Sequence, residues 1–201
     1  SSDAIDLDAC NNVHISGCRI SVNDDIVCLK GGKGPWADQD PDNGTNSNIL
    51  VEDCWFGRGP GVLTFGSECI GARNVILRDS EVHGATRVLQ FKMRPDTPQN
   101  YEYVLVENIT GESRYFFYVA PWTQFFDLKG HDGYLMSYGS HVTMRGCRMT
   151  CEKAIAVTEQ PDQYLLSDIV IEDNEIIETG APDAAPQKED WQLPTGTPDS
   201  K

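Results

Sequence analysis

The sequence predicts an all-β fold, a single-stranded parallel β-helix in which short strands stack coil upon coil. Three observations predict it: one strand–turn–strand pattern recurs, its copies are unequally spaced, and helical periodicity is nowhere sustained. A constant strand pattern with variable spacing indicates coils of fixed shape joined by loops of different length. In such a solenoid each coil buries its apolar residues against its neighbours, so equivalent positions form ladders.

Each copy of the pattern alternates apolar and other residues, bends at a small or polar residue, and resumes as a second short strand. The clear copies start at Val13, Ile49, Val75, Val142 and Ile169. A looser copy starts at Val104 and has Gly111 where the pattern requires an apolar residue. Successive starts are 36, 26, 29, 38 and 27 residues apart, as expected for one coil plus a loop.

The bend of the pattern is expected to form one ladder, made of Cys18, Cys54, Ser80, Cys147 and Asn174. The chain has seven cysteines, an odd number, with no Cys-x-x-Cys pair and no zinc-like spacing to histidine. Small buried thiols are therefore expected, and neither a disulfide framework nor a cysteine metal site.

Two insertions interrupt the repeats, and their composition is typical of loops: residues 31–47 and 114–140. Long insertions in a solenoid tend to collect on one face, which is often the binding face. From residue 179 the chain is rich in Pro, Ala and Asp. We therefore expect residues 1–178 to form the β-helix and residues 179–201 a tail or linker.

The charge of the chain restricts its partners. The 201 residues carry a formal charge of −15, and residues 159–201, with 11 acidic residues and two lysines, hold most of it. Phosphate and anionic lipid attract cationic surfaces, so neither nucleic acid nor a membrane is an expected partner. No stretch of the sequence reaches the roughly 20 apolar residues that cross a bilayer.

Carboxylates are the residues most able to carry chemistry. Asp24 and Asp25 follow one apolar strand and precede another, so we expect them at a bend of a strand edge. Asp3 lies 21 residues earlier, close to one coil length, and stacking would place it beside them. Like charges raise the pKa of one member, and a neutral acid beside ionised carboxylates is what glycoside hydrolysis requires. The alternative is that Asp24 and Asp25 only cap a turn.

These residues, taken in order, resemble the signature of glycoside hydrolase family 28, the polygalacturonase-like enzymes built on a right-handed parallel β-helix. That signature reads Asn-Thr-Asp, Asp-Asp, Gly-His-Gly and Arg-Ile-Lys. The chain has Ser-Ser-Asp3, Asp24-Asp25, Gly-Pro60-Gly and Gln90-Phe-Lys92. The resemblance ends at about residue 110. Because the family's β-helices have several coils ahead of the first motif, it implies that residues 1–178 are the C-terminal part of a longer catalytic β-helix.

The resemblance also implies a reaction. The enzyme would be an inverting hydrolase of α-linked pectic sugars that needs no metal or other cofactor. Asp24 would be the general acid that protonates the leaving oxygen. Asp3 and Asp25 would hold and activate the attacking water, with acid and base roughly 6.5–9.5 Å apart.

Substrate binding is assigned on the same basis. Lys92 would bind a sugar carboxylate or hydroxyl at the bond that is cleaved. Gln90, Arg58 and Tyr118 complete the expected substrate-binding set. Tyr118 comes from an aromatic-rich segment, since sugar rings stack on aromatic faces, and Trp122 is the alternative to it.

Two positions depart from the signature and keep other functions open. Pro60 stands for the histidine and cannot titrate, and Gln90 stands for the arginine and lacks its bidentate fork. Arg58, Arg87 and Arg94 are alternatives for the missing guanidinium. A hydrolase of another pectic sugar such as rhamnose, a carbohydrate-binding β-helix without catalysis, and a calcium-dependent pectic lyase therefore remain alternatives.

We expect the protein to be secreted or periplasmic and to be a monomer. Its expected partner is a poly- or oligosaccharide substrate.

Overall fold

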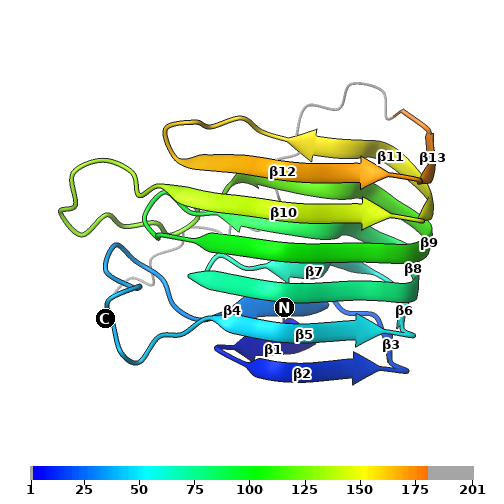
Figure 1. Cartoon of the computed structure of the whole chain (residues 1–201), viewed down its shortest axis with the longest axis horizontal. Coiled ribbons are helices and arrows are strands. Elements are labelled where there is room, and N and C mark those ends of the chain that lie inside the picture. The colour runs from blue at the N-terminus through cyan, green and yellow to red at the C-terminus, as the bar shows by residue number, and fades with distance from the viewer. Residues whose placement is uncertain (1, 181–201) are drawn as a thin grey trace, which may run out of the picture.

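The chain is all-β in the computed structural model, which describes residues 2–180. Its thirteen strands are β1 (Ile5–Asp8), β2 (Asn11–Ser16), β3 (Arg19–Ile20), β4 (Val27–Lys30), β5 (Asn46–Glu52), β6 (Trp55–Phe56), β7 (Gly59–Phe65), β8 (Gly71–Met93), β9 (Asn100–Pro121), β10 (Ser137–Arg145), β11 (Arg148–Val157), β12 (Tyr164–Glu172) and β13 (Glu175–Glu178). All their pairings are parallel. Figure 1 shows the coils stacked on one another, which confirms the predicted parallel β-helix.

The coils present three faces. The first face holds β2, β5, β10, β12 and the opening parts of β8 and β9. The second face holds β3, β6, β13, the middle of β8 and β9 and the start of β11. The third face holds β1, β4, β7 and the closing parts of β8, β9 and β11. The predicted catalytic residues lie at or beside this third face.

A left-handed residue makes the corner between the first and second faces in every coil. The corner residues have φ of +49° to +65° and are Gly17, Asp53, Asp79, Asn108, Gly146 and Asp173. Gly, Asn and Asp adopt this conformation at the least cost, which explains their place in the repeat. The next residue forms the predicted ladder: the Cys54 amide donates to Ser80 Oγ (3.1 Å) and the Cys147 amide to Asn174 Oδ1 (2.9 Å).

Two coils are more continuous than the sequence pattern indicated. β8 and β9 run for 23 and 22 residues, because strand pairing continues through their corners. A single register irregularity, between His83 and Ala85, takes up the bend. The predicted second insertion, residues 114–140, therefore begins too early: β9 reaches Pro121 and the loop covers residues 122–136. The first loop covers residues 31–45.

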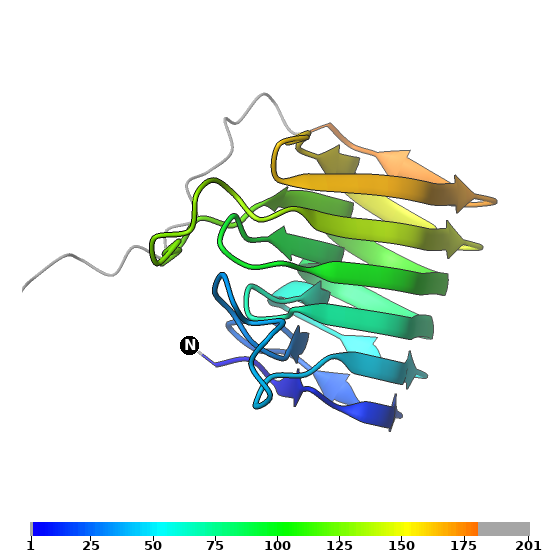
Figure 2. The same ribbon diagram turned by 60° about the vertical axis from the view of Figure 1, so that its left-hand side comes forward.

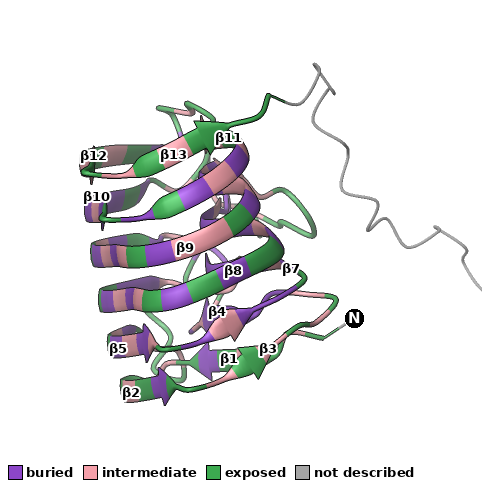
Figure 3. Cartoon of the chain, turned by 90° about the vertical axis from the view of Figure 1, so that its right-hand side faces the viewer, coloured by how far each residue is buried: buried purple, intermediate pink, exposed green. Residues whose placement is uncertain are grey.

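The core fills the interior of the coils, as the banding of buried residues in Figure 3 shows. Behind the third face it is aromatic: Phe91 contacts Phe65, Tyr101 and Phe117 with ring centroids 4.7 to 5.6 Å apart. All four rings are at most 1% exposed. Aromatic side chains bury large apolar areas, so this stack gives the site a rigid base.

The two long loops project from the same side of the coils, where the strands of the first face begin (Figures 1 and 2).

The seven cysteines have free thiols. Burial raises the pKa of the Cys147 thiol to about 11, which fits the predicted structural role. Residues 2–180 include no helix long and apolar enough to cross a membrane. The predicted tail lies, from residue 181 on, outside the described residues.

Candidate active site

Stacking of the first coils positions the predicted catalytic pair. Asp25 lies just before β4 and is 1% exposed. Its carbonyl oxygen accepts from the Ala4 amide at 2.9 Å, and the Ile26 amide donates to the Gly61 carbonyl at 2.8 Å. The backbone on both sides of Asp25 is therefore held by hydrogen bonds to the two adjacent coils. Asp24 is half-buried beside it.

Asp3 lies beside this pair, as the coil length predicts. The register pairs Ile5 with Val27, so Asp3 falls opposite the residues just before β4. The Asp25 amide donates to Asp3 Oδ1 at 3.2 Å and to Asp24 Oδ1 at 3.0 Å. One backbone N–H thus brings the three aspartates together.

Two lysines neutralise these carboxylates. Lys92 Nζ lies 2.7 Å from Asp25 Oδ2, and Lys30 Nζ lies 3.1 Å from Asp3 Oδ2 and 3.6 Å from Asp6 Oδ1. The register aligns Leu29, Phe65 and Phe91, so Lys30 and Lys92, each one residue later, occupy the same ladder position two coils apart. The result is a compact cluster of both charge signs on the third face.

The environment separates the pKa values of two neighbouring carboxyls. Burial acts to raise the pKa of Asp3, but a hydrogen bond with Asp6 and the charge of Lys30 outweigh it and hold this pKa below its usual range. Burial raises the pKa of Asp6, and its hydrogen bond with Asp3 adds to the effect. An ionised Asp3 beside a more readily protonated Asp6 follows. Sequence reasoning did not single out Asp6 or Lys30 as part of the site.

Aromatic rings cover the cationic side of the cluster. Lys92 Nζ lies 4.4 Å from the centroid of the Trp122 ring, and the guanidinium of Arg87 lies 4.3 Å from that of Tyr118. The Trp122 amide donates to the Met93 carbonyl at 2.7 Å, which fixes the residue directly after β9. Trp122, the alternative in the sequence assignment, is thus the aromatic residue in contact with Lys92.

Gln90, predicted to bind substrate, is 1% exposed and lies under the surface of the third face. Its register partners are Thr64 and Tyr118. The structure thus places Gln90 beside the aspartate cluster but beneath its surface, and its contact with substrate stays a prediction.

The other predicted arginines have different surroundings. Arg58 is exposed at the turn before β7, and its guanidinium donates a hydrogen bond to Asn23 Oδ1.

Pro60, in place of the motif histidine, is half-buried in β7 and has no titratable group. At the neighbouring Gly59, a Cβ would come within 2.8 Å of the Ile26 side chain, so a larger residue would require Ile26 to shift.

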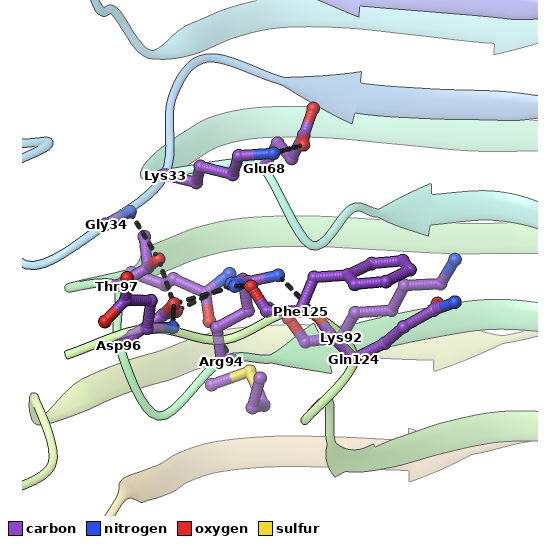
Figure 4. A network of polar contacts seen from close by, with 12 residues as sticks. Lys33, Gly34, Glu68, Lys92, Arg94, Asp96, Thr97, Gln124 and Phe125 are labelled. Carbon is purple, nitrogen blue, oxygen red and sulfur yellow. Dashed lines mark hydrogen bonds and ion pairs between the residues drawn. The ribbon is translucent and has the colours of Figure 1, made fainter. Parts of the chain in front are cut away.

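Arg94 serves the fold and offers nothing to a substrate. It is 3% exposed and forms two 2.7 Å bonds with Asp96, shown in Figure 4. It also donates to the carbonyl oxygens of Gln124 (3.1 Å) and Phe125 (3.0 Å). Thr97, which accepts from the Gly34 amide, joins the first loop to the same network. The network fastens both long loops to the end of β8.

The cluster is poorly suited to a metal ion. Ligand atoms of Asp3, Asp25 and Cys28 lie within 4.8 Å of one another. However, lysine ammonium groups already pair with both carboxylates. Burial, followed by the charge of Asp25, raises the pKa of the Cys28 thiol well above its usual range, so it stays protonated. Thiolate, not thiol, is the form that binds metals.

Comparison with known proteins points to one family. The family model described as glycosyl hydrolases family 28 matches residues 1–112. Among solved structures, a family 28 exopolygalacturonase of Yersinia enterocolitica is similar at 13% identity, with a TM-score of 0.30, over 90% of this chain and 39% of that chain. The chain thus spans well under half of that enzyme. No curated protein matches the sequence significantly.

Proposed function

Since the chain belongs to family 28 of the glycosyl hydrolases, we propose that it is a glycosidase that cleaves α-glycosidic bonds of pectic polysaccharide with inversion of configuration. The observation that carries the proposal is that the Asp25 amide donates hydrogen bonds to the carboxylates of both Asp3 and Asp24. A polymeric substrate of this kind is met outside the cytoplasm, so a secreted or periplasmic location is part of the proposal.

In the proposed reaction, Asp24 donates its proton to the leaving glycosidic oxygen. Asp3 and Asp25 orient the water that attacks the anomeric carbon from the opposite side, and one of them takes its proton. The low pKa of Asp3 supports a base role, because an ionised carboxylate is ready to accept that proton.

The spacing of acid and base is shorter than expected from the sequence. Asp3 Oδ1 and Asp24 Oδ1 contact one nitrogen, so they lie no more than about 6 Å apart, below the roughly 6.5–9.5 Å that separates inverting carboxyl groups. The anomeric form of the first product therefore tests inversion directly. Asp3 Oδ2 is engaged by Lys30, so Oδ1 is its oxygen on the Asp24 side.

The test is release of reducing sugar by the full-length protein from polygalacturonate, rhamnogalacturonan and aryl glycosides, with product anomers read by NMR. Inversion of an α-link gives the β-anomer first, and initial α-anomer would contradict the mechanism. Asp24→Asn should lower kcat by a factor of at least about 10², the range of general-acid contributions. Asp162→Asn, an exposed carboxyl, is the matched control and should keep full activity.

A carbohydrate-binding function without catalysis is the second candidate, favoured by Pro60 in place of a titratable residue. It predicts heat of binding with oligosaccharides in calorimetry and no turnover on any glycan in the screen. Activity that a chelator abolishes, with unsaturated products, would instead indicate a lyase.

A further inference from the structure

Three buried oxygen atoms beside the aspartate cluster lack a hydrogen-bond partner among the described residues. They are Asp25 Oδ1, Thr64 Oγ1 and Gln90 Oε1. Each of the three residues is at most 1% exposed. Leaving a buried polar atom without a hydrogen bond is costly, so three of them at one place call for a ligand.

The three oxygens lie close to one another beside Gly61. A Cβ built on Gly61 would lie 2.1 Å from Thr64 Oγ1, 3.1 Å from Asp25 Oδ1 and 3.2 Å from Gln90 Oε1. The arrangement follows from the coils: Thr64 in β7 pairs with Gln90 in β8, and the Gly61 carbonyl accepts from Ile26, the residue after Asp25. A side chain at position 61 would displace the Thr64 hydroxyl, so glycine lets the three oxygens lie this close together.

The donor count identifies the ligand. A carboxylate oxygen and an amide oxygen only accept, whereas a threonine hydroxyl donates one hydrogen bond. A species that donates twice and accepts once satisfies all three groups, and water does this with the three partners typical of buried waters. A metal cation is disfavoured, because Lys92 Nζ already lies 2.7 Å from the other oxygen of Asp25 and Arg87 is the register partner of Gly61.

We propose that Asp25, Thr64 and Gln90 hold one buried water molecule, which donates to Asp25 Oδ1 and Gln90 Oε1 and accepts from Thr64. This water is separate from the attacking water, which meets Asp25 together with Asp3, because its other two ligands, Thr64 and Gln90, lie beneath the surface. Gln90 is then a positioning residue: with Lys92 on Oδ2, the water on Oδ1 fixes the plane of the Asp25 carboxylate. The role in catalysis rests on the proposed function, but the site does not.

The first test is a crystal structure of the protein at a resolution that shows ordered water. The expected result is a density peak within hydrogen-bond distance of all three oxygens, lost in Thr64→Val and kept in Thr64→Ser. Two outcomes overturn the proposal. One is a Gln90 amide turned to donate directly to Asp25, with no peak. The other is an anomalous peak at this position after a rubidium soak, which would show a cation.

The second test separates kcat from KM. A less firmly held Asp25 carboxylate should slow the chemical step without changing how substrate binds, so Thr64→Val should lower kcat at an unchanged KM and Thr64→Ser should restore it. An unchanged kcat in a folded Thr64→Val overturns the positioning role. Absence of turnover in the unchanged protein would refute the proposed function and leave the density to decide the water site.

Discussion

The buried ion pair of Arg94 and Asp96 should be the main attachment of the two long loops. Both side chains are 3% exposed, and two 2.7 Å bonds join them. Arg94→Met keeps the length of the side chain and removes the guanidinium. It leaves Asp96 buried with Thr97 Oγ1 and the Asp127 amide as its remaining donors.

Removing one partner of a buried ion pair costs about 3–5 kcal/mol, because the other charge stays buried without compensation. The carbonyls of Gln124 and Phe125 also lose their donor, but both residues are exposed and water can replace it. We therefore expect Arg94→Met to lower the free energy of unfolding by about 3–5 kcal/mol, measured by urea denaturation with circular dichroism.

Arg73→Met is the matched control for the same chemical change. Arg73 is 66% exposed, its nitrogen lies 3.9 Å from Glu102, and such exposed pairs contribute about 0–1 kcal/mol. Equal losses in the two variants, or a loss below about 1 kcal/mol in Arg94→Met, would refute the reasoning. Coupling with Asp96→Asn in a double-mutant cycle isolates the pair from the lost loop contacts.

The pH dependence of the loss has a definite sign. Burial acts to raise the pKa of Asp96, but the hydrogen bonds from Arg94 and the Asp127 amide outweigh it and hold this pKa below its usual range. A lowered pKa in the folded state stabilises the fold above the unfolded value of about 3.9, and this contribution is lost as the pH falls through the folded value. The difference between Arg94→Met and the unchanged protein should therefore shrink below about pH 4.

Two further changes test the coil geometry and the site. Gly111→Ala should destabilise the fold by more than about 2 kcal/mol, since φ is +123° and a Cβ would lie 2.0 Å from the Val82 carbonyl oxygen. The control Gly84→Ala, with φ of +90° and open space around the Cβ, should cost only about 1 kcal/mol of strain. Equal losses of unfolding free energy in urea denaturation would contradict this prediction. Lys30→Met should raise the pKa of Asp3, so its loss of stability should be larger at pH 7 than at pH 3; a loss independent of pH would contradict the pairing.

The repeat pattern was sufficient to predict the fold because the corner has a strict backbone requirement. Asp53 and Asp79 recur in the sequence since few residues adopt the left-handed conformation there. A second left-handed position lies within the strands of the first face, at Asn48 and Asn74. The sequence pattern does not predict it, because Tyr103 occupies the same position in the next coil. The loop prediction from composition was wrong at its start, because the aromatic residues that directly follow residue 114 belong to β9.

The site was predictable only in part. The length of one coil was sufficient to predict that Asp3 lies beside Asp25. It was not enough for Gln90, because strand alternation predicts that Cys28, Thr64 and Gln90 point away from the core and hence are exposed. They are buried all the same, each at most 1% exposed, so a further layer of side chains covers this face. A single sequence carries no signal for that outer layer.

The charges around Lys92 bear directly on which sugar is recognised. Its ammonium already pairs with Asp25 at 2.7 Å, lies under the Trp122 ring and is 12% exposed, so a sugar carboxylate would place a second anion on one cation. With the neutral Gln90 buried below, no compensating charge comes from that position. A sugar hydroxyl avoids this repulsion and accepts from the same ammonium without displacing Asp25. On the proposed function, we therefore expect a hydroxyl contact at Lys92 and activity on neutral pectic sugars in the substrate screen.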